Sequence, residues 1–214
     1  MSRLQNLAKG LILVALVTGL YNFVDRVVLT NPVAQSDTRT KNYVKAQRRI
    51  QQALVTQASE LDLSGLYLTQ LPSELHKLSK LKELNLDRNR LNTLPPEIGQ
   101  LTHLQKLHIG NNQLQSLPSE IGQLSNLQIL DLWSNQLTSL PPEIFKLTRL
   151  QHLNLASNQL TNLPPEIAQL SKLQELNLRN NQLSGLLPEI TQLSKLEALN
   201  LGENQVDRLP PNIG

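Results

Sequence analysis

The sequence predicts a right-handed α/β solenoid, a horseshoe with a parallel concave sheet and an N-terminal capping helix. Two observations predict it. A unit of 23 residues recurs through most of the chain, and its leucines follow first the spacing of a strand and then that of a helical turn. One unit cannot bury its leucines alone, so stacked units must share one continuous core. Seven units begin at regular intervals: Ala58, Leu81, Leu104, Leu127, Leu150, Leu173 and Leu196.

The fourth unit shows how each copy is expected to fold. Leu130 and Leu132 alternate with Asp131, which is the period-two pattern of a short strand with one buried side. Pro142 then suits the first turn of a helical segment, where its missing N–H costs no hydrogen bond. Glu143 follows near the positive end of the helix dipole, which explains the recurring glutamates as helix-start electrostatics rather than as a catalytic row.

An asparagine follows the strand in six of the seven units. Its amide can turn the chain and donate hydrogen bonds to backbone carbonyls of neighbouring turns. The first unit departs from this pattern with Leu66, and the sixth has Leu187 where the others have proline. We expect a structural ladder of amides along the stack, formed by Asn89, Asn112, Asn135, Asn158, Asn181 and Asn204.

Repeated in this way, the unit L-x-x-L-x-L-x-x-N-x-L-x-x-L-P-x-E-I-x-x-L-x-x resembles the leucine-rich repeat family, in the LPxEIxxL subclass found in bacterial and plant Ras-group proteins. The resemblance covers residues 58–214, and residues 48–72 are similar to the entry segment of bacterial members. It implies the solenoid fold directly. It implies function only as a class, because one fold supports many activities.

Composition excludes several kinds of site. The chain has no cysteine, so it has no disulfide framework, no thiolate zinc site and no thiol nucleophile. It contains no phosphate-binding loop of the G-x-x-x-x-G-K-S/T kind, and its four histidines lack metal-ligand spacing. We predict a non-enzymatic protein with no cofactor and no metal. The acidic repeats and the aromatic content of 3% also argue against a nucleic-acid partner.

Charge separates the N-terminal part of the chain from the repeats. Residues 1–57 hold eight Lys/Arg and two Asp, a net charge of +6, whereas residues 58–214 hold twelve Lys/Arg and fifteen Asp/Glu, a net charge of −3. Residues 1–30 contain a basic head and the mostly apolar run 11–24, which favours a hydrophobic signal peptide or membrane anchor. A helix that packs on the repeats is the alternative reading of this segment.

The predicted segment leaves several localisations open. Its fourteen apolar residues are fewer than the roughly 20 of a membrane span, and no convincing cleavage site follows them. We expect a membrane-anchored or exported protein if the segment is a targeting signal, and a cytoplasmic protein if it is not. The absence of cysteine and of Asn-x-Ser/Thr acceptors fits a bacterial or intracellular protein better than an animal ectodomain.

Two short segments connect the hydrophobic stretch to the repeats. Residues 31–40 are polar with a proline break, which predicts a linker. Residues 41–57 predict an amphipathic helix with Tyr43, Ala46 and Ile50 on one side. Because the first unit of a stack needs a polar outer surface, we expect this helix to cover the N-terminal end of the leucine core.

Side chains between the strand leucines should point out of the sheet onto its concave face. Trp133 is the only tryptophan, and the small residues Gly110 and Ala156 beside it are expected to leave its indole accessible. An exposed aromatic group ringed by polar residues is typical of a binding hot spot, whereas merely covering its neighbours is the alternative role. We predict a partner-binding surface formed by Trp133, Ile129, His108, His152, Asp131, Arg179, Asp87, Arg88 and Glu203.

The preferred hypothesis is a protein-interaction module that holds a protein or peptide ligand on its concave face. The seventh unit stops at Gly214 before its last inward leucine, so apolar surface is expected at that end of the stack. That end favours two alternatives: the sensor or targeting part of a larger signalling protein whose effector domain is absent here, or a cell-envelope structural protein that self-assembles. The oligomeric state stays open.

Overall fold

The computed structural model describes residues 38–207 and residue 210. The chain divides into two units, residues 1–41 and residues 42–214, and the repeats lie in the second. The predicted hydrophobic segment at residues 1–30 lies outside the described residues and stays a prediction. No helix in the described part of the chain combines the length and the apolar character needed to cross a membrane.

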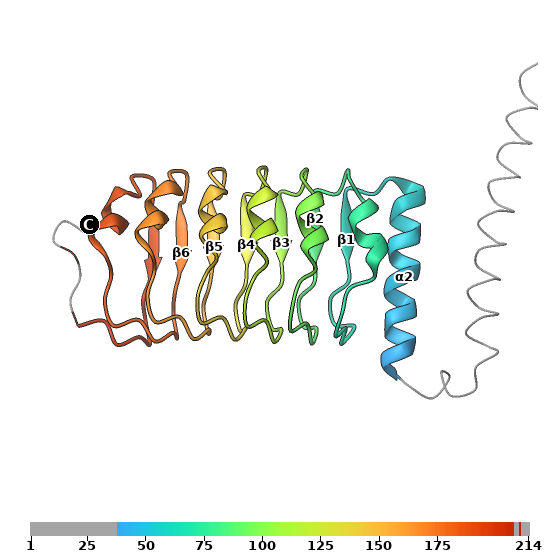
Figure 1. Cartoon of the computed structure of the whole chain (residues 1–214), viewed down its shortest axis with the longest axis horizontal. Helices are drawn as coiled ribbons and strands as arrows, with labels where there is room; N and C mark the ends of the chain where they lie inside the picture. Colours follow the sequence, from blue (N-terminus) through green and yellow to red (C-terminus); the bar gives the residue numbers. More distant parts are fainter. Residues whose placement is uncertain (1–37, 208–209, 211–214) are drawn as a thin grey trace, which may run out of the picture. The chain divides into compact units, whose positions relative to one another are not determined.

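Seven strands of three residues each form one parallel sheet in the order of the sequence (Figure 1). Pairing advances by one repeat from strand to strand, so that Leu130 lies between Leu107 and Leu153. The predicted solenoid with a parallel sheet is therefore confirmed. The strands are β1 (Glu60–Asp62), β2 (Glu83–Asn85), β3 (Lys106–His108), β4 (Ile129–Asp131), β5 (His152–Asn154), β6 (Glu175–Asn177) and β7 (Ala198–Asn200).

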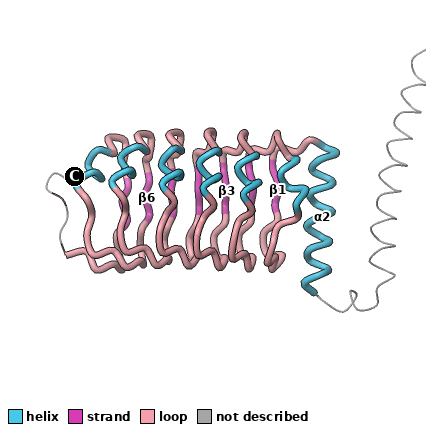
Figure 2. Tube along the Cα trace, viewed as in Figure 1, coloured by secondary structure: helices cyan, strands magenta, loops and turns pink. Residues whose placement is uncertain are grey.

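Short 3-10 helices occupy the positions where the sequence predicts helical turns, and they line the stack on the side opposite the strands (Figure 2). In the fourth unit the N–H of Leu147 donates to the carbonyl of Ile144 at 3.2 Å, the i→i+3 bond of this helix type. Each helix directly follows a proline, or Leu187 in the sixth unit. The helices are η1 (Ser73–Lys77), η2 (Pro96–Gln100), η3 (Ser119–Gln123), η4 (Pro142–Lys146), η5 (Pro165–Gln169) and η6 (Pro188–Gln192).

Buried asparagines join neighbouring units below the strands. The Asn135 amide nitrogen donates to the carbonyls of Ile109 and Leu132, both at 3.0 Å, and its oxygen accepts the N–H of Leu114 at 3.0 Å. Each asparagine thus satisfies backbone groups of its own unit and of the preceding one. The same three bonds recur at Asn89, Asn112, Asn158, Asn181 and Asn204.

One position in each 3-10 helix sets how closely successive helices pack. A Cβ atom added to Gly99 would lie 2.6 Å from the carbonyl oxygen of Glu120, and one added to Gly122 would lie 2.6 Å from that of Glu143. Glycine therefore lets η2, η3 and η4 approach backbone to backbone. Phe145 occupies the equivalent position in η4 and is fully buried. Accordingly, η4 and η5 pack less closely than η2 with η3 or η3 with η4.

Helix α2 (Thr38–Thr56) precedes the first repeat and runs along its end (Figure 1). The predicted capping helix at residues 41–57 is therefore correct in kind, but it begins three residues earlier, and the last three residues of the predicted linker are helical. The rest of the predicted linker, residues 31–37, lies outside the described residues. The side chains of α2 that are buried against the core are Ala46, Ile50 and Ala53.

The C-terminal end of α2 is closed by a left-handed residue. Gln57 has a φ of 52°, and the N–H of Ala58 donates to the carbonyl of Ala53 at 2.9 Å. This six-to-one bond is the Schellman ending of a helix, which satisfies a carbonyl that the helix leaves unpaired. It turns the chain directly from α2 into β1.

Candidate partner-binding surface

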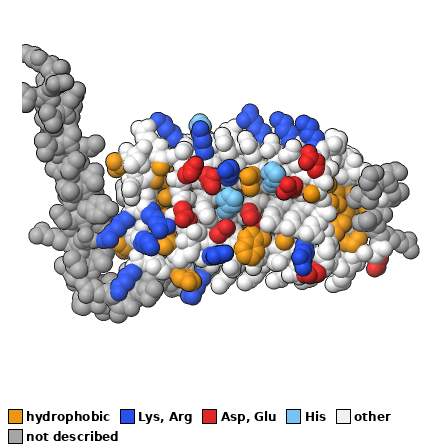
Figure 3. Space-filling model, turned by 180° about the vertical axis from the view of Figure 1, so that it is seen from behind, with side chains coloured by type: hydrophobic (Ala, Val, Ile, Leu, Met, Phe, Trp, Pro, Cys, Tyr) orange, Lys and Arg blue, Asp and Glu red, His pale blue; other side chains and the backbone are white. Residues whose placement is uncertain are grey.

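The face of the sheet that points away from the leucine core is called the sheet face here. In β4 Leu130 is buried, whereas Ile129 and Asp131 on either side of it are half-buried and point to this face. Acidic and histidine side chains gather toward the half of the sheet face that is nearer to β1 (Figure 3). The predicted residues Ile129 and Asp131 are therefore displayed on the sheet face.

The last residue of every strand except β3 is Asp or Asn, and these side chains form a row across the sheet. The carboxylate of Asp131 accepts the N–H of Trp133 at 3.2 Å, and the amide oxygen of Asn154 accepts the N–H of Ala156 at 3.1 Å. Each side chain thus closes a turn onto the backbone two residues ahead. The same bond is made by Asp62, Asn85, Asn177 and Asn200.

The row is interrupted in β3, where His108 stands in place of Asp or Asn. The N–H of Gly110 instead donates to the carboxylate of Asp87, which comes from the preceding unit, at 2.6 Å. Asp87 is half-buried, and it is also close enough to His108 to interact with it electrostatically. The interruption therefore draws Asp87, His108 and Gly110 into one cluster, which Asp131 joins from β4 through its interaction with His108.

Trp133 lies over Gly110. A Cβ atom added to Gly110 would lie 2.0 Å from Nε1 and 2.2 Å from Cδ1 of the indole, so only glycine leaves room for this orientation. The sequence predicted that Gly110 would leave the indole accessible. In the structure the ring occupies the space beside Gly110, and Trp133 is half-buried. Asp87, His108, Gly110, Asp131 and Trp133 together are called the Trp133 cluster below.

We expect Gly110→Ala to displace the indole, because the new Cβ and the ring would overlap. Trp133 is the only tryptophan, so the emission maximum and quenching of intrinsic fluorescence report on this ring alone. We predict a red shift and easier quenching by iodide, as the indole moves toward water.

Gly202→Ala is the matched control for this change. Gly202 occupies the same position in the last unit, and the nearest atom to an added Cβ is the side-chain oxygen of Asn200 at 3.4 Å, which is tolerable. This variant should leave the spectrum unchanged. Unchanged fluorescence in Gly110→Ala would contradict the placement of the ring.

Two carboxyl groups of the cluster have raised pKa values. Burial raises the pKa of Asp131, and the charge of Asp87 adds to this effect, against the N–H of Trp133 and the nearby His108. Burial likewise raises the pKa of Asp87, against the N–H of Gly110, His108 and Arg88. Both groups are therefore harder to ionise in the folded protein than in the unfolded chain.

The raised pKa of Asp131 predicts a pH-dependent effect of Asp131→Asn. The folded state holds this proton more tightly than the unfolded state, so the stability contributed by Asp131 is present below its unfolded pKa and lost as pH rises through the folded value. Asparagine keeps the acceptor for the Trp133 N–H, as Asn154 does one unit later. We expect the variant to gain free energy of unfolding at neutral pH.

That gain should shrink as pH falls through the raised pKa of the folded state. It should be absent below about pH 3.9, the ordinary pKa of aspartate, where the carboxyl group is protonated in both the folded and the unfolded protein. Urea unfolding of the two proteins at neutral and acidic pH measures the difference. A gain that does not vary with pH would contradict a raised pKa.

The remaining predicted residues lie apart from the cluster. Ile129 begins β4, whereas Trp133 follows the strand in the turn that Asp131 closes. His152, directly opposite Ile129, contacts the carboxylate of Glu175 through Nδ1 at 3.1 Å. Arg179 and Glu203 are exposed and form an ion pair with each other two units away. These residues border the sheet face and do not share one binding centre.

Two features of the surface were not predicted from sequence: the backbone conformation of Arg88, itself a predicted binding residue, and the contact between Tyr67 and Arg90. Arg88 is exposed and adopts a left-handed φ of 55°, which orients it by backbone geometry. Tyr67 is 55% exposed, and the guanidinium of Arg90 lies 5.0 Å from its ring centroid. Tyr67 and Arg90 are 23 residues apart, so the repeat period itself places them side by side.

No group of three His, Asp or Glu side chains is arranged to hold a metal ion among the residues that the structure describes. Two side-chain pairs join residues at the first position of neighbouring strands. They are Lys106 with Glu83, at 2.9 Å, and His152 with Glu175. The chemistry available on the sheet face is thus hydrogen bonding, ion pairing and aromatic contact.

Family models match the repeats. A model described as leucine-rich repeat region matches residues 102–208, half of the chain, and a leucine rich repeat model matches residues 56–114. No curated protein matches the chain.

Several solved structures are similar to the chain. The leucine-rich repeat domain of the type III effector XopL is 31% identical with a TM-score of 0.71, covering 89% of this chain and 68% of that one. An internalin from Listeria monocytogenes is 30% identical with a TM-score of 0.63, over 74% and 46% of the two chains. The plant peptide hormone receptor RGFR1, in complex with RGF2, is 33% identical with a TM-score of 0.60, over 68% and 24%. The chain thus spans less than half of the internalin and about a quarter of the plant receptor.

Proposed function

The chain belongs to the leucine-rich repeat family, a protein-interaction fold, and we propose that it holds a protein or peptide partner on its sheet face. The single observation that carries this proposal is the half-buried Trp133, seated on Gly110 in the middle of that face. Tryptophan is over-represented in binding hot spots, because it contributes a large contact area at little cost in conformational freedom. The peptide-bound plant receptor among the similar structures supports a ligand of this kind.

The proposal is supported by where the repeats differ from one another. Most units close the strand with Asp or Asn, but His108 breaks this rule. Gly110 and Trp133 occupy one variable position of the repeat in two adjacent units, and they fit each other. Positions at which a sequence abandons its own structural rule are the places where function is expected.

Rigidity of the surface favours binding. The sheet face is held by backbone pairing between all seven strands and by the asparagine ladder beneath it. A surface that is already ordered loses little entropy when a partner binds, so more of the contact energy appears as affinity.

We expect Trp133→Ala to weaken partner binding by about 2 kcal/mol or more, which corresponds to roughly thirtyfold in Kd. Partners are first captured by chemical cross-linking from lysate of the source cells with the full chain as bait. The Kd of the partner identified in this way is then measured for both proteins by titration calorimetry.

The matched control is Tyr67→Asn, which removes the exposed ring at the turn after β1 and keeps a residue that tolerates a φ of 53°. It should leave the Kd of the same partner unchanged. Equal affinity of the wild type and of Trp133→Ala would exclude the sheet face around Trp133 as the binding surface.

A further inference from the structure

The last position of the repeat carries positive charge along one edge of the solenoid. This position lies in the turn between a 3-10 helix and the next strand. From the first unit to the sixth it holds Lys80, His103, Asn126, Arg149, Lys172 and Lys195. In Figure 3, Lys and Arg side chains follow the upper edge of the sheet face. The last three members are cations in consecutive units, and Arg149, Lys172 and Lys195 are called the Arg149 row below.

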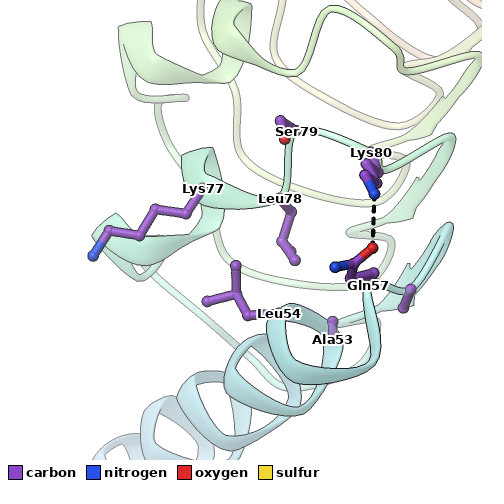
Figure 4. A pocket seen from close by; sticks show the side chains of 8 residues that line it. Ala53, Leu54, Gln57, Lys77, Leu78, Ser79 and Lys80 are labelled. Atoms are coloured by element: carbon purple, nitrogen blue, oxygen red, sulfur yellow. Dashed lines mark hydrogen bonds between the residues drawn. The ribbon is translucent and has the colours of Figure 1, made fainter.

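Side chains at this position reach the same position of the preceding unit. The Arg149 guanidinium donates to the side-chain oxygen of Asn126, 23 residues earlier, at 2.5 Å. The Lys80 ammonium likewise donates to the side-chain oxygen of Gln57 at 2.7 Å (Figure 4). By contrast, Lys172 and Lys195 are exposed and have no hydrogen-bond or ion-pair partner among residues 38–207 and 210. Their charge is therefore available to a ligand.

The fold does not require a cation at this position. Asn126 occupies it in the third unit, where the N–H of Ser125 donates to the carbonyl of Gln123 at 2.8 Å. The N–H of Thr148 makes the same bond to Lys146 at 2.9 Å before Arg149. Backbone bonds thus close the turn whichever side chain follows. Because like charges in neighbouring strands repel each other, three consecutive cations are best explained by a negatively charged partner.

Uncharged hydrogen-bonding groups accompany the Arg149 row. The residue before each cation is an exposed hydroxyl side chain: Thr148, Ser171 and Ser194. Two residues after the cations come the half-buried Gln151 and Gln174 and the exposed Glu197. Within the part of the chain that the structure describes, these hydroxyl and amide side chains make no hydrogen bond. Each unit therefore presents a cation with a free hydroxyl group, and the first two units add a free amide.

We propose that the Arg149 row binds a linear acidic polysaccharide. One carboxylate of the polymer meets each cation, while sugar hydroxyls pair with the serine, threonine and glutamine side chains beside the row. Successive units advance by about 4.8 Å, the spacing of neighbouring strands, which is close to the length of one sugar residue in an extended chain. A polymer of uronic acids, with one carboxylate in every residue, stays in register with the row. This inference does not depend on the partner proposed for the sheet face.

An acidic peptide and a nucleic acid fit the row less well. Side chains on one side of an extended peptide recur about every 6.7 Å, so a run of Asp or Glu loses register with cations spaced about 4.8 Å apart. The row and the hydroxyl and amide positions beside it hold no aromatic ring on which a base would stack. An acidic sugar polymer matches both the spacing and the uncharged groups.

The test is binding of the full chain to immobilised polymannuronate, measured by biolayer interferometry. Wild type is compared with the triple variant Arg149→Asn, Lys172→Asn, Lys195→Asn, because Asn126 already occupies the same position in the third unit. One exposed ion pair contributes up to about fivefold in affinity, so the loss of three should raise Kd about 10- to 100-fold at low salt. Circular dichroism verifies that the variants are folded.

The matched control removes three exposed cations elsewhere, with Lys45→Gln, Lys77→Gln and Arg90→Gln. Glutamine occupies the positions of Lys77 and Arg90 in most other units. This variant should bind polymannuronate as the wild type does. Asn126→Lys extends the row by one cation and should strengthen binding up to about fivefold, a gain that misfolding cannot produce.

Three results would overturn the inference. The first is equal binding of polymannuronate by the wild type and the row variant, and the second is an equal loss in the control variant. The third is tighter binding of the wild type to polyglutamate or to duplex DNA than to polymannuronate of the same charge. That result would assign the row to an acidic peptide or to a nucleic acid.

Discussion

Asn135→Ala is expected to lower the free energy of unfolding by about 2–6 kcal/mol, because a buried N–H left unpaired costs roughly 1–3 kcal/mol and each of two further hydrogen bonds lost costs roughly 0.5–1.5 kcal/mol. The substitution leaves the Leu114 N–H without its acceptor. It also removes one of the two asparagine amides that donate to each of the Ile109 and Leu132 carbonyls, which keep the amides of Asn112 and Asn158. All three groups are buried, so water cannot replace the amide without opening the stack. Urea unfolding followed by circular dichroism measures the loss.

Asn204→Ala provides the matched control within the same ladder. Asn204 makes the same three bonds, to the carbonyls of Leu178 and Leu201 and from the N–H of Leu183, but these are only partly buried. Water can reach the freed groups, and we expect a loss of about 1 kcal/mol. If both alanine variants lost equal stability, burial of the ladder would not be the source of its contribution.

Phe145→Ala is expected to cost about 3–5 kcal/mol, the usual range for removing a buried phenylalanine. Phe145 is fully buried and is the largest fully buried side chain of the described residues. Removing it leaves a cavity between η4 and its neighbours that the leucine core cannot fill. Denaturant unfolding gives the loss, and Lys146→Ala at the exposed next position should change stability by less than about 0.5 kcal/mol.

The same variant tests how the 3-10 helices are spaced. Gly99 and Gly122 allow backbone contact between successive helices, whereas Phe145 holds η5 away from η4. If η5 moved in after the substitution, the cavity would close and the cost would fall to about 1.5–3 kcal/mol, the transfer free energy of the lost side chain. A large loss would instead show that strand pairing on the opposite side keeps η4 and η5 apart.

The repeat architecture was predictable because every unit buries the same residues. The side chain of Leu130 cannot be buried within its own unit. The 23-residue spacing leaves one way to bury it, in register between Leu107 and Leu153 of the neighbouring units. The hydrogen-bonding ability of the Asn135 amide was also readable, since an amide that follows a strand has backbone groups within reach. The helix type was less predictable: five residues after a proline are compatible with an α-turn, and the tight closure to the next strand selected the 3-10 form.

The candidate surface was predicted only in part. The alternation of leucines identified which residues reach the sheet face, including Trp133, His108 and Asp131. It did not show that the indole turns onto Gly110, because a side-chain rotamer depends on atoms of the neighbouring unit. It also grouped His152 with Trp133, although His152 pairs with Glu175 in another row.

The sequence by itself determined the stacking of the repeats, the identity of the buried leucines and the residues displayed on the sheet face. These follow from local periodicity, because a strand has only two sides and a unit only one core. The tertiary structure decided which displayed residues act together. Three features depend on residues about one repeat apart in sequence. They are the hydrogen bond from Gly110 to Asp87, the packing of Trp133 on Gly110, and the spacing of η4 and η5 around Phe145. Such contacts depend on side-chain volume and orientation across units, which the periodic pattern does not encode.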